Sequence, residues 1–478
     1  MAKGIVWPIK KRCQEISVFA FRRQIVYLPE ASFLHFFPAP SPPFTDGVSP
    51  PMLSPDLAYG SGDRLLPPSV PYRFFGAALV FHLLGWLTLL LTPDPLAGFT
   101  GGQNSVLAGL HLLTLGVLAT TAMGAGYQLL PMATVRPVRS VGWSKASFWT
   151  FVPGVLGFAA GLAHQHLPAT LLGAALLATG LTIFAVLTLD NMRQTGEMPL
   201  VGTHVRVAMT GLALTLIFGL LLLANLAHGF LPDHRALAAA HVAVAVYGFM
   251  GMLVFGFSSI LIPMLALARA PDAALSRKAL LAGTGALGLA AAGGISGIYP
   301  LLALAALMGG AAASLHVWIM VRVLKTRMRK TLGFFFWPIR IAWGLLPLSL
   351  GLGLLAALDL LPGNGGALFV IAAVPGWLLL FLFGILQRIL PFLASVHVSQ
   401  YSRRPPLVSA LAPEAPLKAH LVCHLAAVAL LLLAAAGGWE PLARLGAALG
   451  AIGAIAFLGF AGLVYRRTRA CLALAQAA

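Results

Sequence analysis

Long apolar runs separated by short polar breaks cover most of the chain. A helix needs about 20 residues to cross a bilayer, and each run is close to that length. The pattern predicts twelve membrane-spanning helices, with ends defined to within a few residues. Their approximate limits are 73–93, 105–131, 147–163, 168–189, 207–228, 236–264, 279–297, 299–321, 335–359, 367–395, 419–437 and 442–465.

One short element recurs in predicted spans 2, 6 and 10, near the end of each. It consists of a glycine, six residues and a proline, at 124–131, 256–263 and 384–391. A polar residue precedes each proline by three or four positions: Gln128, Ser259, and Gln387 with Arg388. The recurrence predicts three pseudo-repeats of four helices, at about 73–189, 207–321 and 335–465.

Composition agrees with an all-α integral membrane protein. The chain is 59% hydrophobic and 9% charged, whereas soluble domains carry roughly 25% charged residues. A net charge of +18 is also typical of nucleic-acid-binding proteins, but 28 of the 31 Lys and Arg residues lie in the termini and in alternate loops. Lys and Arg accumulate in cytoplasmic loops, so we expect both termini in the cytoplasm and no nucleic acid. The three cysteines are far apart and form no CxxC pair, which supports neither a disulfide framework nor a thiolate metal site.

The ends of the chain differ from the middle. Residues 1–71 are basic, aromatic and proline-rich, which predicts a disordered or surface-lying segment. Translation that begins at Met52 is an alternative explanation of this segment, and no cleavable signal peptide is apparent. The membrane domain is predicted at 72–466, followed by a short cytoplasmic tail at 467–478.

Histidines within the spans are the first candidates for chemistry, because ionisable groups inside a membrane are costly and often functional. His111 and His241 lie near the outer ends of spans 2 and 6, 20 and 22 residues before the repeated proline. Two imidazoles at similar depth can ligate haem or copper; alternatively, each bonds a carbonyl or water at the interface. His82, in the middle of span 1, is predicted to be a haem ligand or a buried neutral imidazole.

Further candidates are predicted toward the cytoplasmic side. His420 and His424 are four residues apart and share one helix face, so they could hold a metal ion near Cys423, or simply reach cytoplasmic water at a helix start. His316 lies in span 8, and Arg388 could pair with a haem propionate or extend to anionic lipid. Six other histidines are predicted to be solvated in the tail, loops or helix ends: His35, His164, His166, His204, His228 and His234.

The stretch HLLTLGVLATTAMGAGYQLLP, with the organisation of three repeats of four helices, resembles subunit I of the haem-copper oxidases and nitric oxide reductases. It is most similar to their NnrS-like branch, which contains haem and copper. The resemblance covers residues 73–466 in architecture, but in motif only about 107–135 and, less well, 240–265. It implies that His111 ligates haem b and that His241 ligates copper.

Three departures from that family affect the expected activity. The histidine pair of span 7 is missing from LLAGTGALGLAAAGG, and the two histidines of span 10 are missing from GGALFVIAAVPGWLLL. Tyr247 follows His241 by six residues instead of four, so it faces elsewhere. We therefore expect no complete dinuclear centre and no proton-pumping oxygen reduction.

Three functions follow from these observations. The first is a haem protein of a bacterial-type inner membrane that acts in nitric oxide or redox stress, or in electron transfer. Its partners would be the lipid bilayer and respiratory-chain subunits or a cytochrome or quinol donor. The second is a secondary transporter without a prosthetic group, although familiar carriers repeat as two halves of six helices. The third is a noncatalytic respiratory or metal-handling subunit.

Overall fold

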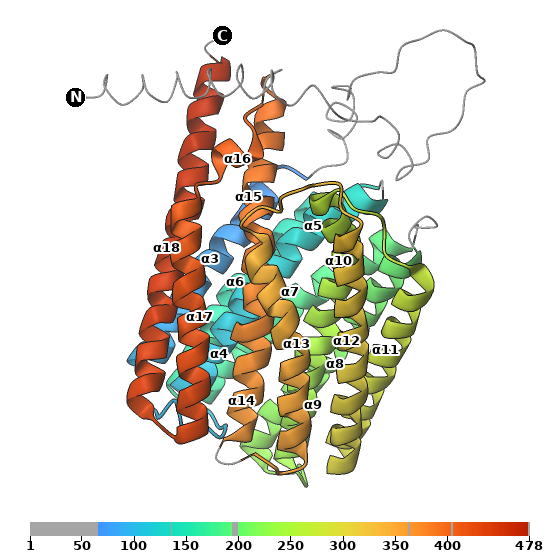
Figure 1. Ribbon diagram of the computed structural model, residues 1–478. Helices are drawn as coiled ribbons and strands as arrows, with labels where there is room; N and C mark the ends of the chain where they lie inside the picture. Colours follow the sequence, from blue (N-terminus) through green and yellow to red (C-terminus); the bar gives the residue numbers. More distant parts are fainter. Residues whose placement is uncertain (1–65, 135, 194–198, 362–363, 403–404, 477–478) are drawn as a thin grey trace. The chain divides into compact units, whose positions relative to one another are not determined.

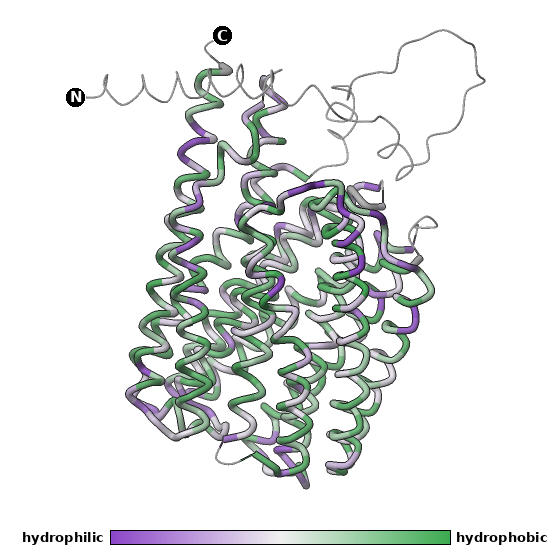
Figure 2. Tube along the Cα trace, in the orientation of Figure 1, coloured by the Kyte–Doolittle hydropathy of each residue, from purple (hydrophilic) through white to green (hydrophobic). Residues whose placement is uncertain are grey.

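A computed structural model describes residues 66–134, 136–193, 199–361, 364–402 and 405–476. Within these ranges, twelve helices are long and apolar enough to span a membrane, as the sequence predicts. In Figure 2 the middles of the helices are largely hydrophobic, and hydrophilic positions gather at helix ends and loops. Residues 1–65 of the predicted N-terminal segment, which include Cys13 and His35, lie outside the described part of the chain.

The helices in chain order are α3 (Ser69–Leu91), α4 (Ser105–His111), η2 (Leu112–Ala119), α5 (Thr120–Thr134), α6 (Val141–Ala163), α7 (Leu167–Met192), α8 (Pro199–His228), α9 (His234–Ala243), η3 (Val244–Gly251), α10 (Met252–Ala266), α11 (Ala273–Ser296), α12 (Tyr299–Lys325), α13 (Phe336–Ala357), α14 (Gly365–Ile371), η4 (Ala372–Leu379), α15 (Leu380–Ser399), α16 (Val408–Leu411), α17 (Glu414–Gly437) and α18 (Glu440–Gln476) (Figure 1). Spans 2, 6 and 10 are therefore composite. Each runs from an α segment through a π segment, labelled η, into a second α segment.

The three π segments are a second feature that recurs in spans 2, 6 and 10, in addition to the glycine-to-proline motif. Each is eight residues long and begins 19 residues before the repeated proline (131 minus 112, 263 minus 244 and 391 minus 372). At the end of η2, the N–H of Thr120 bonds the carbonyl of Leu115, five residues back, as π geometry requires. The three predicted repeats thus share a backbone irregularity at one register.

Contacts divide the chain into two compact units. The larger one comprises 64–387 and 414–459 and contains all three π segments. Within it, η4 contacts both η2 and η3, so the composite helices meet at their π segments. The apolar windows of spans 2 and 6 are 72% and 67% buried, against 28–50% for spans 1, 3–5, 7–9 and 11. The composite helices are therefore central, and the others surround them.

Small residues allow close helix packing in the larger unit. Helices α6 and α7 form its most extensive helix pair. A Cβ at Gly161 would overlap the backbone of Thr170, and one at Gly173 would overlap that of Phe158. Glycine at these two positions lets the two backbones approach, as is common in membrane helix pairs.

The described part of the smaller unit comprises 388–402, 405–413 and 460–476. Among its described residues, the Ser395 hydroxyl donates to the Pro406 carbonyl at 2.7 Å. The Arg467 guanidinium donates to the carbonyl of Ala410, in α16, also at 2.7 Å. These bonds connect the C-terminal part of α15, the short α16 and the C-terminal part of α18.

Candidate functional site

His111 and His241 both lie near the N-terminal ends of spans 2 and 6. His111 is the last residue before η2, and its ring packs edge-on against Phe158 of α6, with centroids 5.2 Å apart. His241 lies three residues before η3 and packs against Gly219 of α8. The two imidazoles are close enough to interact electrostatically. We call them the outer pair.

Hydrogen bonds determine which ring nitrogens of the outer pair can act as ligands. Nδ1 of His111 lies 2.9 Å from the carbonyl oxygen of Leu107, and because a carbonyl only accepts, this nitrogen carries the proton. Nε2 of His111 is therefore the nitrogen with the lone pair. Nδ1 of His241 is buried without a hydrogen-bond partner within ordinary distance, and the Thr215 backbone lies close enough to the ring to act as an acceptor.

A second histidine cluster forms where His82 of α3 meets His420 and His424 of α17. The ring centroids of His82 and His420 are 5.7 Å apart, and those of His420 and His424 are 5.4 Å apart. All three side chains are buried, with 1%, 4% and 1% of their surface exposed. We call them the central cluster.

The central cluster corrects the predicted position of His420 and His424. The sequence placed them at a helix start, where they could reach water, with span 11 beginning at about 419. In the structure α17 begins at Glu414, so His424 lies ten residues inside the helix and contacts Pro375 of η4. Both histidines are buried inside the protein, close to His82 of α3.

Each ring of the central cluster has one nitrogen fixed by a hydrogen bond. The indole N–H of Trp86 donates to Nε2 of His82 at 3.0 Å. Nδ1 of His420 donates to the Gly453 carbonyl at 3.0 Å, and Nε2 of His424 donates to the Pro375 carbonyl at 2.8 Å. The second nitrogen of each ring is buried and has no partner: Nδ1 of His82, Nε2 of His420 and Nδ1 of His424.

Aromatic side chains surround the central cluster. The Phe383 ring lies 4.3 Å from that of His82 and 4.9 Å from that of His420, and the Phe457 ring lies 5.0 Å from His420. Cys423 is directed to Gly453 of α18. In the part of the chain that the structure describes, no three His, Cys, Asp or Glu side chains are arranged to hold a metal ion.

His204 and His316 form a third buried pair, and for His204 this corrects the sequence prediction. Span 5 begins earlier than predicted, so His204 is inside α8, 3% exposed, and donates through Nδ1 to the Leu200 carbonyl at 2.9 Å. The ring of His316 packs against that of Phe255 at a tilt of 32°, with ring centroids 4.2 Å apart, and its Nε2 is buried without a partner. The two histidines interact electrostatically.

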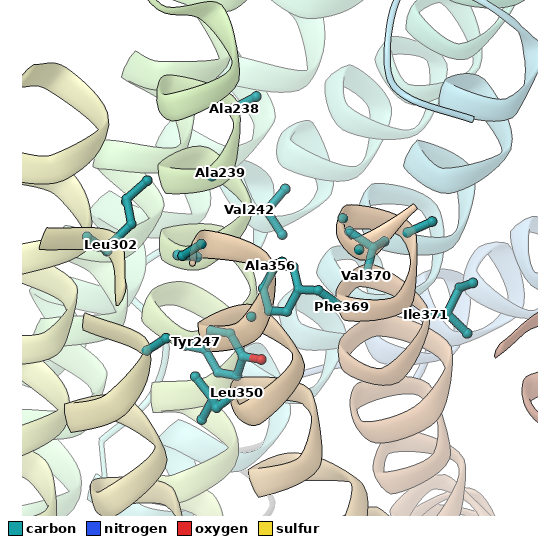
Figure 3. Close-up of a pocket in the computed structure, with 18 of the residues that line it drawn as sticks. Ala238, Ala239, Val242, Tyr247, Leu302, Leu350, Ala356, Phe369, Val370 and Ile371 are labelled. Atoms are coloured by element: carbon teal, nitrogen blue, oxygen red, sulfur yellow. The ribbon is translucent and has the colours of Figure 1, made fainter. Parts of the chain in front are cut away.

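A cavity of about 1150 Å³ lies in the larger unit, lined mainly by small and aliphatic side chains of spans 1, 2 and 6–11. Figure 3 shows part of its wall, with Val242 and Tyr247 on span 6 and Phe369 on span 10. The Tyr247 hydroxyl bonds that of Ser349 at 2.7 Å, and its ring stacks on Trp377, with centroids 5.3 Å apart. Tyr247 therefore forms part of the cavity wall, whereas His241 does not line the cavity.

The residues fit a haem only in part. The cavity is apolar and large, but the rings of the outer pair and of the central cluster do not line it; the one histidine on its wall is His234. Nδ1 of His234 accepts a hydrogen bond from the Asn225 amide at 3.1 Å. An imidazole of the outer pair could therefore ligate haem iron only on its own side of spans 2 and 6, next to α6 and α8.

Two of the polar residues that precede the repeated prolines make local hydrogen bonds. Gln387 donates to the Phe383 carbonyl at 3.4 Å, and Ser259 donates to the Phe255 carbonyl at 3.1 Å. These bonds go to the carbonyl four residues back, instead of to the one that the following proline leaves free. The side-chain oxygen of Gln128 is buried without a partner. Arg388 is the first residue of the α15 segment that belongs to the smaller unit.

Comparisons with known proteins identify the fold. No protein-family model and no curated protein matches the sequence. Among solved structures, a haem-copper terminal oxidase dimer determined by cryo-EM matches with a TM-score of 0.58, over 84% of this chain and 84% of that chain, at 12% identity. At this identity the likeness concerns the fold. The chain is thus a protein of twelve apolar helices whose fold is similar to that of a haem-copper terminal oxidase.

Proposed function

We propose that this chain is a membrane redox protein that holds haem b through His111 of the outer pair, without a complete oxygen-reducing centre. The observation that carries the proposal is that His111 and His241, at nearly corresponding positions of two repeats, are close enough to interact electrostatically, with a lone pair on Nε2 of His111. A haem bound there would supply one-electron transfer and binding of diatomic gases. Copper at His241 is the corresponding proposal for a second metal.

The protein's own contribution would be to fix the ligand ring and to exclude water. The Leu107 carbonyl holds the proton on Nδ1 of His111, which leaves Nε2 for the metal, the usual role of a second bond to a ligating histidine. Phe158 limits rotation of that ring.

The missing histidines support a function other than oxygen reduction with proton pumping. Helix α11 contains no histidine, and neither does the segment from Gly365 to Leu379. We therefore propose a role in nitric oxide or redox stress, or in electron transfer beside a respiratory chain, as in the NnrS-like branch. We further propose a bacterial-type inner membrane as its location, and a respiratory subunit or a cytochrome or quinol donor as its partner.

A reduced-minus-oxidised absorption spectrum of detergent-purified protein tests the proposal. We expect a b-type spectrum in the wild type that is lost in His111→Ala. His164→Ala, a change in a loop histidine that ends α6, is the matched control and should retain it. A loss of copper with retention of haem in His241→Ala would assign His241 to copper. A featureless wild-type spectrum after expression with sufficient haem would refute the proposal.

A second variant tests on which side of spans 2 and 6 the haem binds. Val242→Trp places an indole in the cavity, where Figure 3 shows Val242 on the wall. If the outer pair ligates the haem, this variant should retain the spectrum. Loss of the spectrum in Val242→Trp, together with retention in His111→Ala, would place the haem in the cavity instead.

A transporter is the alternative that the cavity favours, since substrate sites of transporters lie near the middle of the membrane between helices. The oxidase-like fold and the repeat of three units weigh against it. Wild-type protein without haem or copper, but with solute uptake that Val242→Trp abolishes, would support the transporter.

A further inference from the structure

We propose that the central cluster is a binding site for one cuprous ion, with His420 and His424 as its two protein ligands and His82 beside it as a non-ligand. The site is separate from the outer pair. It lies on spans 1 and 11, which provide none of the ligand positions that the oxidase resemblance implies. Copper binding at the central cluster is therefore independent of haem binding at His111.

The first argument is the state of the ring nitrogens. A carbonyl only accepts hydrogen bonds, so Nδ1 of His420 and Nε2 of His424 carry their protons toward Gly453 and Pro375. This leaves a lone pair on Nε2 of His420 and on Nδ1 of His424, both buried and without a partner. No proton has to leave either ring before a metal binds. Histidines that ligate metals typically donate their other N–H to a carbonyl or carboxylate, as both do here.

The second argument is that His82 cannot be a third ligand. The indole N–H of Trp86 only donates, so Nε2 of His82 is the acceptor and its lone pair is occupied. The proton of the neutral ring is then on Nδ1, which has no lone pair to offer. The site therefore has two ligands, which agrees with the absence of any three-residue metal group among the described side chains.

The third argument concerns the spacing of the rings. Two imidazoles that share one ion at about 2.0 Å per bond have ring centroids up to roughly 6 Å apart. The centroids of His420 and His424 are 5.4 Å apart. Residues four apart on a helix lie on one face, so the backbone of α17 already provides this spacing.

The fourth argument selects the ion. Imidazole binds copper, zinc, iron and nickel. The aromatic side chains that contact the rings of the central cluster are neutral: Phe383, Phe457 and Trp86. The cost of burying an ion grows with the square of its charge, so without a carboxylate a divalent ion costs about four times as much as a monovalent one. Among these metals the monovalent ion is Cu(I).

Titration of the full-length protein in nanodiscs with Cu(I), under reducing anaerobic conditions and against a chromogenic Cu(I) chelator, tests the proposal. The parent protein carries His241→Ala, so that copper at the outer pair is not counted. We expect one equivalent of Cu(I), not displaced by a tenfold excess of Zn²⁺. His420→Gln and His424→Gln should each weaken binding by about 100-fold or more.

His82→Gln is the matched control, because it lies in the same cluster, is equally buried and can still accept from Trp86. It should retain the equivalent of copper, and its loss there would overturn the two-ligand assignment. X-ray absorption of the copper-loaded parent should show two imidazole nitrogens, a measurement that does not depend on whether the glutamine variants fold. A parent protein that binds no Cu(I) in this titration would overturn the proposal.

Discussion

Arg444 joins the start of α18 to the loop after α3, and its removal should destabilise the larger unit. Its guanidinium donates to the carbonyls of Leu90 at 3.1 Å, Thr92 at 2.5 Å and Asp94 at 2.9 Å. Its Nε also pairs with Glu440 at 2.7 Å. One side chain therefore satisfies three carbonyl groups where α3 ends.

The magnitude follows from the number of these bonds. A hydrogen bond to a charged group contributes about 1.5–3 kcal/mol. The Arg444 side chain is 28% exposed, and in Arg444→Ala water can reach the carbonyls, so we take about 1 kcal/mol for each of the three bonds. The partly exposed ion pair with Glu440 adds only a few tenths of a kcal/mol. The expected loss in the free energy of unfolding is about 3 kcal/mol, roughly a 150-fold change in the equilibrium constant.

Unfolding by denaturant in mixed micelles measures this change. Arg444→Lys should cost about 2 kcal/mol, because a single ammonium cannot reach all three carbonyls as the planar guanidinium does. Arg469→Ala, an exposed arginine of the same helix, is the control and should leave stability within about 0.5 kcal/mol. A loss below about 0.5 kcal/mol in Arg444→Ala would refute the reasoning.

Two further variants test other contacts. Gly450→Ala would place a Cβ within the Trp86 indole, so we expect a lower melting temperature and a weaker hydrogen bond from Trp86 to His82. The control, Gly459→Ala, meets open space and should leave the melting temperature unchanged. A hydrogen bond from the Ala236 N–H holds the pKa of Asp233 below its ordinary value. That stabilisation is present above about pH 4 and is lost as the pH falls through the lowered pKa. Asp233→Asn should therefore flatten the decline in melting temperature below pH 4, and an unchanged decline would contradict this role.

The spans and the repeat were predictable because both are local in the sequence. Apolar length defines each span, and the spacing from glycine to proline in spans 2, 6 and 10 reports the three units. The π segments left no comparable signal. Residues such as those of η4, AAVPGWLL, are all buried, so no alternation of polar and apolar residues reveals the wider turn.

The central cluster was not predictable, for two physical reasons. The order of helices around a bundle depends on packing between distant segments, so the meeting of α3 with α17 could not be read from periodicity. The start of α17 was also placed five residues too late, which put His420 at the water boundary. For His204 a signal did exist: Leu200 and Val201 extend the apolar run of span 5 toward its N-terminus.

The common register of the π segments bears on how such a chain could have arisen. Three units that differ in most of their residues retain one backbone irregularity at the same distance from one proline. Duplication of a single ancestral four-helix segment, already carrying the wider turn, would leave this record after the side chains had diverged. Histidines could then be gained or lost in each copy separately, as the unequal sets on spans 2, 6 and 10 illustrate. The path of the main chain in spans 2, 6 and 10 would therefore retain a record of the duplication that most of the amino-acid sequence of the three units no longer shows.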